Sequence, residues 1–209
     1  MGIKYCPKCH DGVINTDNGI CIQCGFEPRK TSHIQEYVDK IIAFSFDCAN
    51  VICRMEDNDI SSEGKKTRDE KWFKVLLEII YFYIHLTDRF AFGLWDEETR
   101  DSVMTDIVEG TIPIVAEQIC QEWPEEMVDK IKQECMDNFV NAMKEYGSYQ
   151  KLSAKKDEDL KDTLFWEFGK NVANLTEEWP NPASIIRIEG IVTISLKELD
   201  INSFIEKAR

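Results

Sequence analysis

The chain of 209 residues lacks the features that would place it in a common class at once. It has no run of 18 uncharged apolar residues, so no membrane-spanning helix is expected. It contains none of the glycine-rich phosphate-binding loops, no Gly-x-Ser-x-Gly and no His-Glu-x-x-His. Only His33 and His85 follow residue 31, and neither stands three residues after a glutamate, so a di-iron carboxylate bundle is not expected. These absences leave no reaction that the sequence points to.

Positive charge is also scarce. The chain has 25 Lys and Arg against 39 Asp and Glu, which gives a formal net charge of −14. Residues 1–31 carry a balance of +1, so the remaining residues carry −15. A body this acidic repels phosphate backbones and anionic membrane surfaces. Nucleic acid and membranes are therefore not expected partners, whereas another protein is.

Four of the eight cysteines are spaced to hold a metal ion. Cys6 and Cys9 form one Cys-x-x-Cys pair, and Cys21 and Cys24 form another after eleven residues. Each pair supplies two thiolates from one turn, and a tetrahedral zinc site needs four. The spacing predicts one zinc ion per chain at these four residues. Iron is an alternative in the same site, because four thiolates do not exclude it.

The segment between the two pairs is able to fold back on itself. Two short β-branched runs flank Asp17-Asn18-Gly19, which is a strong signal for a hairpin turn. With this hairpin, Tyr5–Cys9 and Ile20–Phe26 resemble the two knuckles of a zinc ribbon, the rubredoxin-like module. The resemblance covers residues 4–27, although His10 stands where such ribbons usually have glycine. It implies a metal-stabilised folding module and says little about activity.

A second interpretation of the first pair is a c-type haem attachment site, because Cys6-Pro-Lys-Cys9-His10 has that signature. Haem attachment normally requires export, and no basic segment followed by an apolar run opens the chain. Haem would also leave the pair Cys21 and Cys24 unexplained. A redox-active dithiol is a further alternative, which the spacing of the four cysteines favours less than zinc. We therefore expect zinc and a cytoplasmic location.

The rest of the chain has a helical period. We predict a mainly α protein in which a zinc ribbon over 1–30 precedes a compact, acidic α-helical bundle over 31–209. The bundle should contain five to six helices, with the most apolar one at its centre. The expected helices cover about 32–56, 68–93, 96–123, 124–146, a stretch that begins before Leu160 and ends near 175, and a last helix over 185–199.

The last of these helices is open to a second interpretation. Its β-branched runs 185–188 and 191–194 are compatible with strands. However, its apolar residues recur at intervals of three and four, which is the period of a helix. We therefore predict a helix. The four cysteines outside the two pairs lie in helix-like segments, where we expect buried, reduced thiols: Cys48, Cys53, Cys120 and Cys135.

A polar stripe runs along the second predicted helix. Glu78, Tyr81, His85, Asp88 and Arg89 fall on one side of it. His85 and Asp88 are three residues apart, and a carboxylate is able to orient an imidazole for proton transfer or metal binding. These two are the candidate catalytic residues. The simpler interpretation is a solvated face or a hydrogen-bond network between helices.

Two functions fit this sequence. The first is a non-catalytic, zinc-binding protein that acts as an interaction or adaptor module for other proteins. The alternative is an enzyme or a small-ligand-binding bundle that uses the stripe around His85 and Asp88. The sequence leans away from an enzyme, and it makes no prediction about oligomeric state.

The zinc site is open to direct measurement. Elemental analysis of protein prepared without added metal should give close to one equivalent of zinc per chain. Cys9→Ser and Cys24→Ser should each greatly weaken zinc binding, because each removes one of four thiolate ligands. Cys53→Ser, outside the pairs, should keep full occupancy and serves as the control. Full occupancy in both ligand variants would show that other residues hold the metal.

Overall fold

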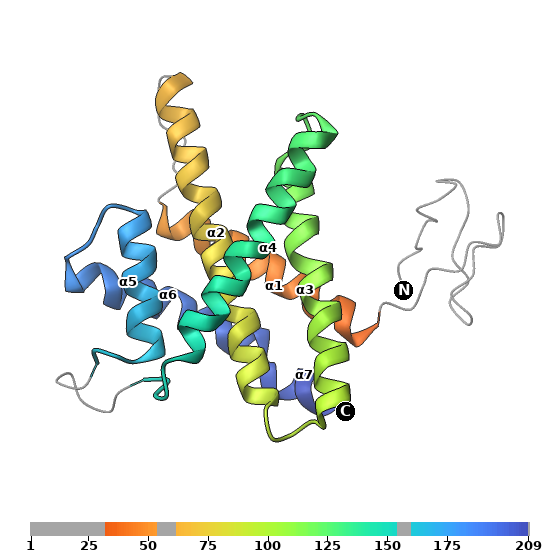
Figure 1. Cartoon of the computed structure of the whole chain (residues 1–209). Coiled ribbons are helices and arrows are strands. Elements are labelled where there is room, and N and C mark those ends of the chain that lie inside the picture. Colours follow the sequence, from red (N-terminus) through yellow and green to blue (C-terminus); the bar gives the residue numbers. More distant parts are fainter. Residues whose placement is uncertain (1–31, 54–61, 154–159, 209) are drawn as a thin grey trace, which may run out of the picture. The chain divides into compact units, whose positions relative to one another are not determined.

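The computed structural model describes residues 32–53, 62–153 and 160–208. The predicted zinc ribbon, its hairpin, the four ligand cysteines and the boundary near residue 30 lie outside these residues. Regular structure within them is entirely helical, so the predicted α-helical bundle is confirmed (Figure 1). The helices are α1 (His33–Ile52), α2 (Ser62–Ala91), α3 (Glu97–Ile119), α4 (Glu125–Gly147), α5 (Leu164–Leu175), α6 (Pro182–Leu199) and α7 (Ile201–Lys207).

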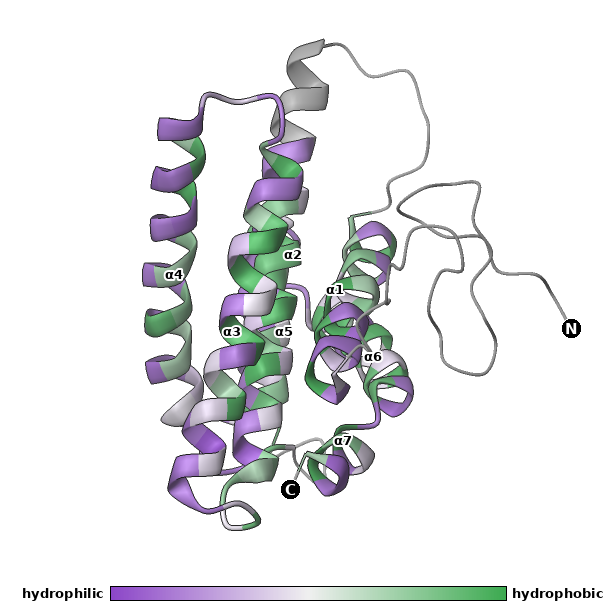
Figure 2. Cartoon of the chain, turned by 90° about the vertical axis from the view of Figure 1, so that its right-hand side faces the viewer, coloured by the Kyte–Doolittle hydropathy of each residue, from purple (hydrophilic) through white to green (hydrophobic). Residues whose placement is uncertain are grey.

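The second helix occupies the centre, as the sequence predicts. It packs against α1, α3, α4, α5 and α7. Between Val75 and Thr87, Glu78 is the one residue that is not fully buried. A helix with large apolar side chains on most of its sides must be covered on each of them, and five neighbours supply that cover. Figure 2 shows the result: hydrophobic residues gather between the helices, while the outer edge of α4 is hydrophilic.

Several helix boundaries differ from the predicted ones. α1 ends at Ile52, four residues before the predicted end, and α5 begins only at Leu164, where Thr163 caps it. α2 begins at Ser62, six residues before the predicted start near 68. The error came from taking Gly64 and its serine neighbours as a loop. An internal glycine costs a helix only about 1 kcal/mol, which the good helix formers after it offset.

The C-terminal segment is helical, so the choice of helix over strands is confirmed. A short helix that the sequence analysis missed, α7, follows at once. Asp200 separates the two helices, because its φ of 50° lies in the left-handed region and ends α6. Its carboxylate then accepts a hydrogen bond from the Ser203 amide at 3.3 Å and caps α7. None of the helices described is long and apolar enough to cross a membrane.

Two glycines, Gly169 on α5 and Gly190 on α6, differ in the space that is available for a side chain. A Cβ atom at Gly169 would lie 2.8 Å from Ile185 Cγ2 and 3.3 Å from the Ile185 carbonyl oxygen. Gly190, on α6, would place its Cβ in open space. Both glycines therefore have a helical backbone, but only Gly169 is closely packed against a neighbouring helix.

Alanine at these positions should have opposite effects. Gly169→Ala should lower the free energy of unfolding by about 1–3 kcal/mol, because the bundle must shift to admit the methyl group. Gly190→Ala should raise it by about 0.5–1 kcal/mol through helix propensity alone. Urea denaturation followed by far-ultraviolet circular dichroism measures both. An undiminished stability in Gly169→Ala would contradict the close packing of the two helices.

Candidate functional site

The predicted zinc ligands Cys6, Cys9, Cys21 and Cys24 lie outside the described residues, so the predicted site has no geometry to report. Within 32–53, 62–153 and 160–208, no group of three or more His, Cys, Asp or Glu side chains is arranged to hold a metal ion.

The other four cysteines are free thiols packed in the bundle. Cys48, Cys120 and Cys135 are buried and Cys53 is half-buried, which agrees with the expectation of small apolar side chains. Burial raises the pKa of Cys53 and of Cys135 to about 11. Because the thiolate is the reactive form, these groups are poor nucleophiles at neutral pH.

The first part of the polar stripe on α2 joins a network between helices. The Glu78 carboxylate accepts hydrogen bonds from the Tyr146 hydroxyl of α4 and, at 3.2 Å, from the Asn171 amide of α5. Burial raises the pKa of Glu78, and these two hydrogen bonds oppose that rise. The Tyr81 hydroxyl donates to the Cys135 carbonyl oxygen at 2.8 Å. These contacts join α2 to α4 and α5.

His85 is buried inside the same region. Its side chain is 7% exposed, and its ring centroid lies 5.6 Å from that of Tyr146. Its Nε2 atom has no hydrogen-bond partner among the described residues. The pKa of His85 is lowered to about 4, chiefly by burial; the charge of Arg89 also lowers this pKa, whereas the charge of Asp88 opposes the shift. The imidazole is therefore neutral at neutral pH and is shielded from solvent.

Asp88 is paired with an arginine and not with His85. Its two carboxylate oxygens accept hydrogen bonds from Arg100 Nε at 2.6 Å and from Arg100 Nη2 at 2.7 Å. A carboxylate held by both prongs of a guanidinium is not available to orient an imidazole. Arg89 donates to the carbonyl oxygens of Tyr149 and Gln150, beyond the end of α4. The structure thus places the stripe residues together without joining His85 to Asp88.

Immediately after the stripe, apolar side chains stand in solvent. Phe90 is 39% exposed, Phe92 is 71% exposed and Leu94 is 53% exposed. We call these three residues the apolar turn, because they lie at the corner where α2 leads into α3. Three large apolar side chains this close together form a patch, whereas a single exposed one would need no explanation.

The apolar turn is held in a fixed conformation. The amides of Phe92 and Leu94 donate to the carbonyl oxygens of Asp88 and Ala91, each at 2.9 Å. Gly93 supplies the φ of +85° that the reversal requires. Next to it, buried Trp95 anchors the corner by donating from Nε1 to the Ile205 carbonyl oxygen of α7 at 3.1 Å. The exposed side chains are therefore presented on a rigid backbone.

The charge that surrounds the apolar turn is negative. Asp96, Glu97, Glu98 and Asp101 are all exposed at the start of α3. The positive charge of nearby Arg100 is committed to Asp88, and its guanidinium carbon lies 5.1 Å from the centroid of the Phe92 ring. The corner therefore combines apolar side chains with an acidic border.

Sequence reasoning found the stripe and missed the apolar turn. The predicted helix reached residue 93, so Phe90 fell inside a helical pattern, and apolar residues in such a pattern are usually core. The available signal was Gly93 between two bulky apolar residues, because such a glycine marks a reversal more often than a helix interior.

The buried imidazole should leave a mark on the pH dependence of stability. Its pKa of about 4 in the folded chain lies below the ordinary value near 6.5, so the unfolded chain binds the extra proton. The corresponding stability is complete above about pH 6.5 and is lost as the pH falls toward 4. Between pH 7 and pH 5, His85→Leu should lose about 2 kcal/mol less unfolding free energy than the parent chain.

Urea titrations at the two pH values measure this difference. His33→Gln, which removes an exposed imidazole, is the comparison variant for the loss of one histidine. An identical pH dependence in His85→Leu and the parent would show that His85 is not desolvated in the folded chain.

No family model matches this chain, and no curated protein and no solved structure matches it significantly. Only the chain's own geometry and sequence pattern therefore bear on its function.

Proposed function

We propose that this protein is a non-catalytic, zinc-binding adaptor that docks onto another protein through the apolar turn. The observation that carries the proposal is the exposure of Phe92 and Leu94 on a rigid corner. In this proposal the N-terminal zinc ribbon supplies a second surface, which rests on the spacing of Cys6, Cys9, Cys21 and Cys24.

A partner that binds the apolar turn gains burial energy and loses little conformational entropy. Burial of a Phe or Leu side chain against a partner contributes about 1.5–3 kcal/mol for each residue. The backbone of the turn is already fixed by hydrogen bonds, so little conformational entropy is lost when a partner binds. Rigid aromatic side chains at the centre of a contact are the usual source of binding energy in protein interfaces.

The acidic border selects the kind of partner. Exposed Asp96, Glu97, Glu98 and Asp101 favour a partner whose apolar pocket is rimmed by basic side chains. The same charges oppose an anionic membrane, which would otherwise compete for an apolar turn. Free cysteines in the bundle agree with a reducing compartment, and we place the protein in the cytoplasm.

An enzyme built on the polar stripe finds less support. A general base needs an accessible imidazole and a carboxylate to orient it, whereas His85 is buried and Asp88 is held by Arg100. No observation on the described residues favours that alternative.

The apolar turn is tested by a double substitution. Phe92→Ser with Leu94→Ser should leave the fold intact, because both side chains are largely in solvent. Affinity capture from the native cell at moderate salt, read by mass spectrometry, should lose the proteins that the parent chain enriches. Reconstitution with the purified partner should then show a dissociation constant raised by at least about tenfold.

Ile194→Ser is the matched control, because Ile194 is 65% exposed on α6 and lies outside the apolar turn. It should capture the same proteins as the parent. Equal capture by the double variant and the parent would remove the apolar turn from the interaction.

A further inference from the structure

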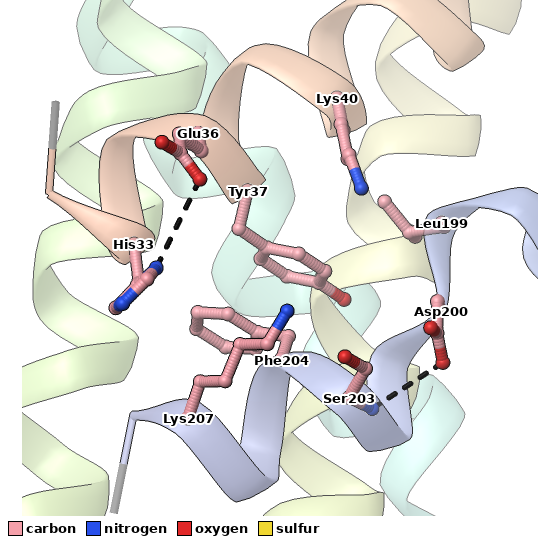
Figure 3. Close-up of a pocket in the computed structure, with 9 residues that line it drawn as sticks. All are labelled: His33, Glu36, Tyr37, Lys40, Leu199, Asp200, Ser203, Phe204 and Lys207. Atoms are coloured by element: carbon pink, nitrogen blue, oxygen red, sulfur yellow. Dashed lines mark hydrogen bonds and ion pairs between the residues drawn. The ribbon is translucent and has the colours of Figure 1, made fainter.

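A small polar cavity lies where α1 meets α7 (Figure 3). Its volume is about 120 Å³. At about 30 Å³ for each water in the liquid, this is room for about four water molecules, or for a group of similar size. Nothing in the proposed adaptor function uses this cavity.

Two stacked rings form its apolar wall. The centroids of Tyr37 and Phe204 are 3.8 Å apart and the rings are tilted by only 6°. Thr87 donates its hydroxyl proton to the Tyr83 carbonyl oxygen at 2.8 Å. The Tyr37 hydroxyl therefore donates to Thr87 Oγ1, at 2.7 Å. Because its proton is committed, Tyr37 fixes the shape of the cavity and offers no donor to a ligand.

The two carboxylates at the edge of the cavity already have partners. Glu36 Oε2 lies 3.8 Å from His33 Nδ1. The Asp200 carboxylate accepts from the Ser203 amide as the cap of α7. In Figure 3 both carboxylates are directed to these partners, at opposite ends of the cavity.

The two lysines have no such partner. Lys40 extends from α1 and Lys207 from α7, and both ammonium groups point toward the space beside the Tyr37 ring (Figure 3). Neither lysine forms an ion pair with any described residue, although the chain has far more acidic than basic residues. The Ser203 hydroxyl also lines the cavity and is able to donate.

We propose that this cavity binds a compact oxyanion, namely a phosphate group held between Lys40 and Lys207. Two ammonium groups on opposite sides supply the charge, and a hydroxyl donor supplies direction. The small volume limits the buried part of the ligand to the phosphate group. The ligand is either free phosphate or a small phosphate monoester, whose remaining atoms would project into solvent.

Titration of the ¹⁵N-labelled full-length chain with inorganic phosphate tests the proposal. At constant ionic strength, so that screening does not change, the amides of Lys40, Ser203 and Lys207 should shift along one saturating curve in the millimolar range. Lys40→Gln and Lys207→Gln should each raise the dissociation constant by about tenfold, because each removes one charged donor.

Charge variants of opposite sign sharpen the test. Glu36→Gln and Asp200→Asn should each tighten phosphate binding, because each removes a negative charge from the edge of the cavity. Asparagine also retains the capping oxygen and tolerates the left-handed backbone at this position. Lys144→Gln, which changes an exposed lysine on α4, should bind phosphate like the parent.

A parallel titration with methyl phosphate identifies the source of the ligand. Binding at least as tight as that of inorganic phosphate indicates a phosphate monoester, and weaker binding indicates the free ion. A shift that stays linear in the parent chain, or a saturating curve that survives in the Lys40→Gln Lys207→Gln double variant, would overturn the proposal.

Discussion

A helix with large apolar side chains on most of its sides is stable only when it is surrounded, and α2 is such a helix from Val75 to Thr87. No single neighbour covers it, so five other helices pack on it from different directions. Those helices do not need to be apolar all round. The outer edge of α4 is hydrophilic (Figure 2).

Burial of α2 also dictates where polar atoms must pair. Glu78, Tyr81 and Thr87 each present an oxygen in a region that water does not reach freely, and each is hydrogen-bonded to another helix. A buried polar group without a partner costs about 1–3 kcal/mol, so these pairs discriminate against other alignments of the helices. On α2, His85 Nε2 is buried without a hydrogen-bond partner, as are Ser45 Oγ and Glu189 Oε1 on other helices, and we have no physical account of why these atoms are tolerated.

The helical class and the central position of α2 follow from local patterns, which a sequence displays directly. The pairing of side chains from different helices does not follow from such patterns. His85 and Asp88 have the spacing of an interacting pair, yet Asp88 pairs with Arg100, twelve residues away, because the reversal at Gly93 brings α3 back alongside. The spacing of residues on one helix carries no information about a competing side chain on the next.

The same limit explains why the apolar turn was missed. Phe90 belongs to a helical pattern, and a pattern shows which residues share a side but not where the covering helices stop. The sequence also does not predict the cavity between α1 and α7, because α7 is seven residues long and too short to show a helical period of its own. Tyr37 and Phe204 are 167 positions apart, so only the folded chain shows that they stack.

At the corner between α2 and α3, Arg100 connects an ion pair of the bundle with an exposed side chain of the apolar turn. One guanidinium is shared between the Asp88 carboxylate and the face of the Phe92 ring. Any molecule that covers Phe92 also removes water from this ion pair, which strengthens the attraction between its charges. A molecule that covered Phe92 would therefore act on the same guanidinium that joins α2 to α3. The stabilisation it gave would follow RT ln(1 + [L]/Kd), with the change in the ion pair already contained in Kd.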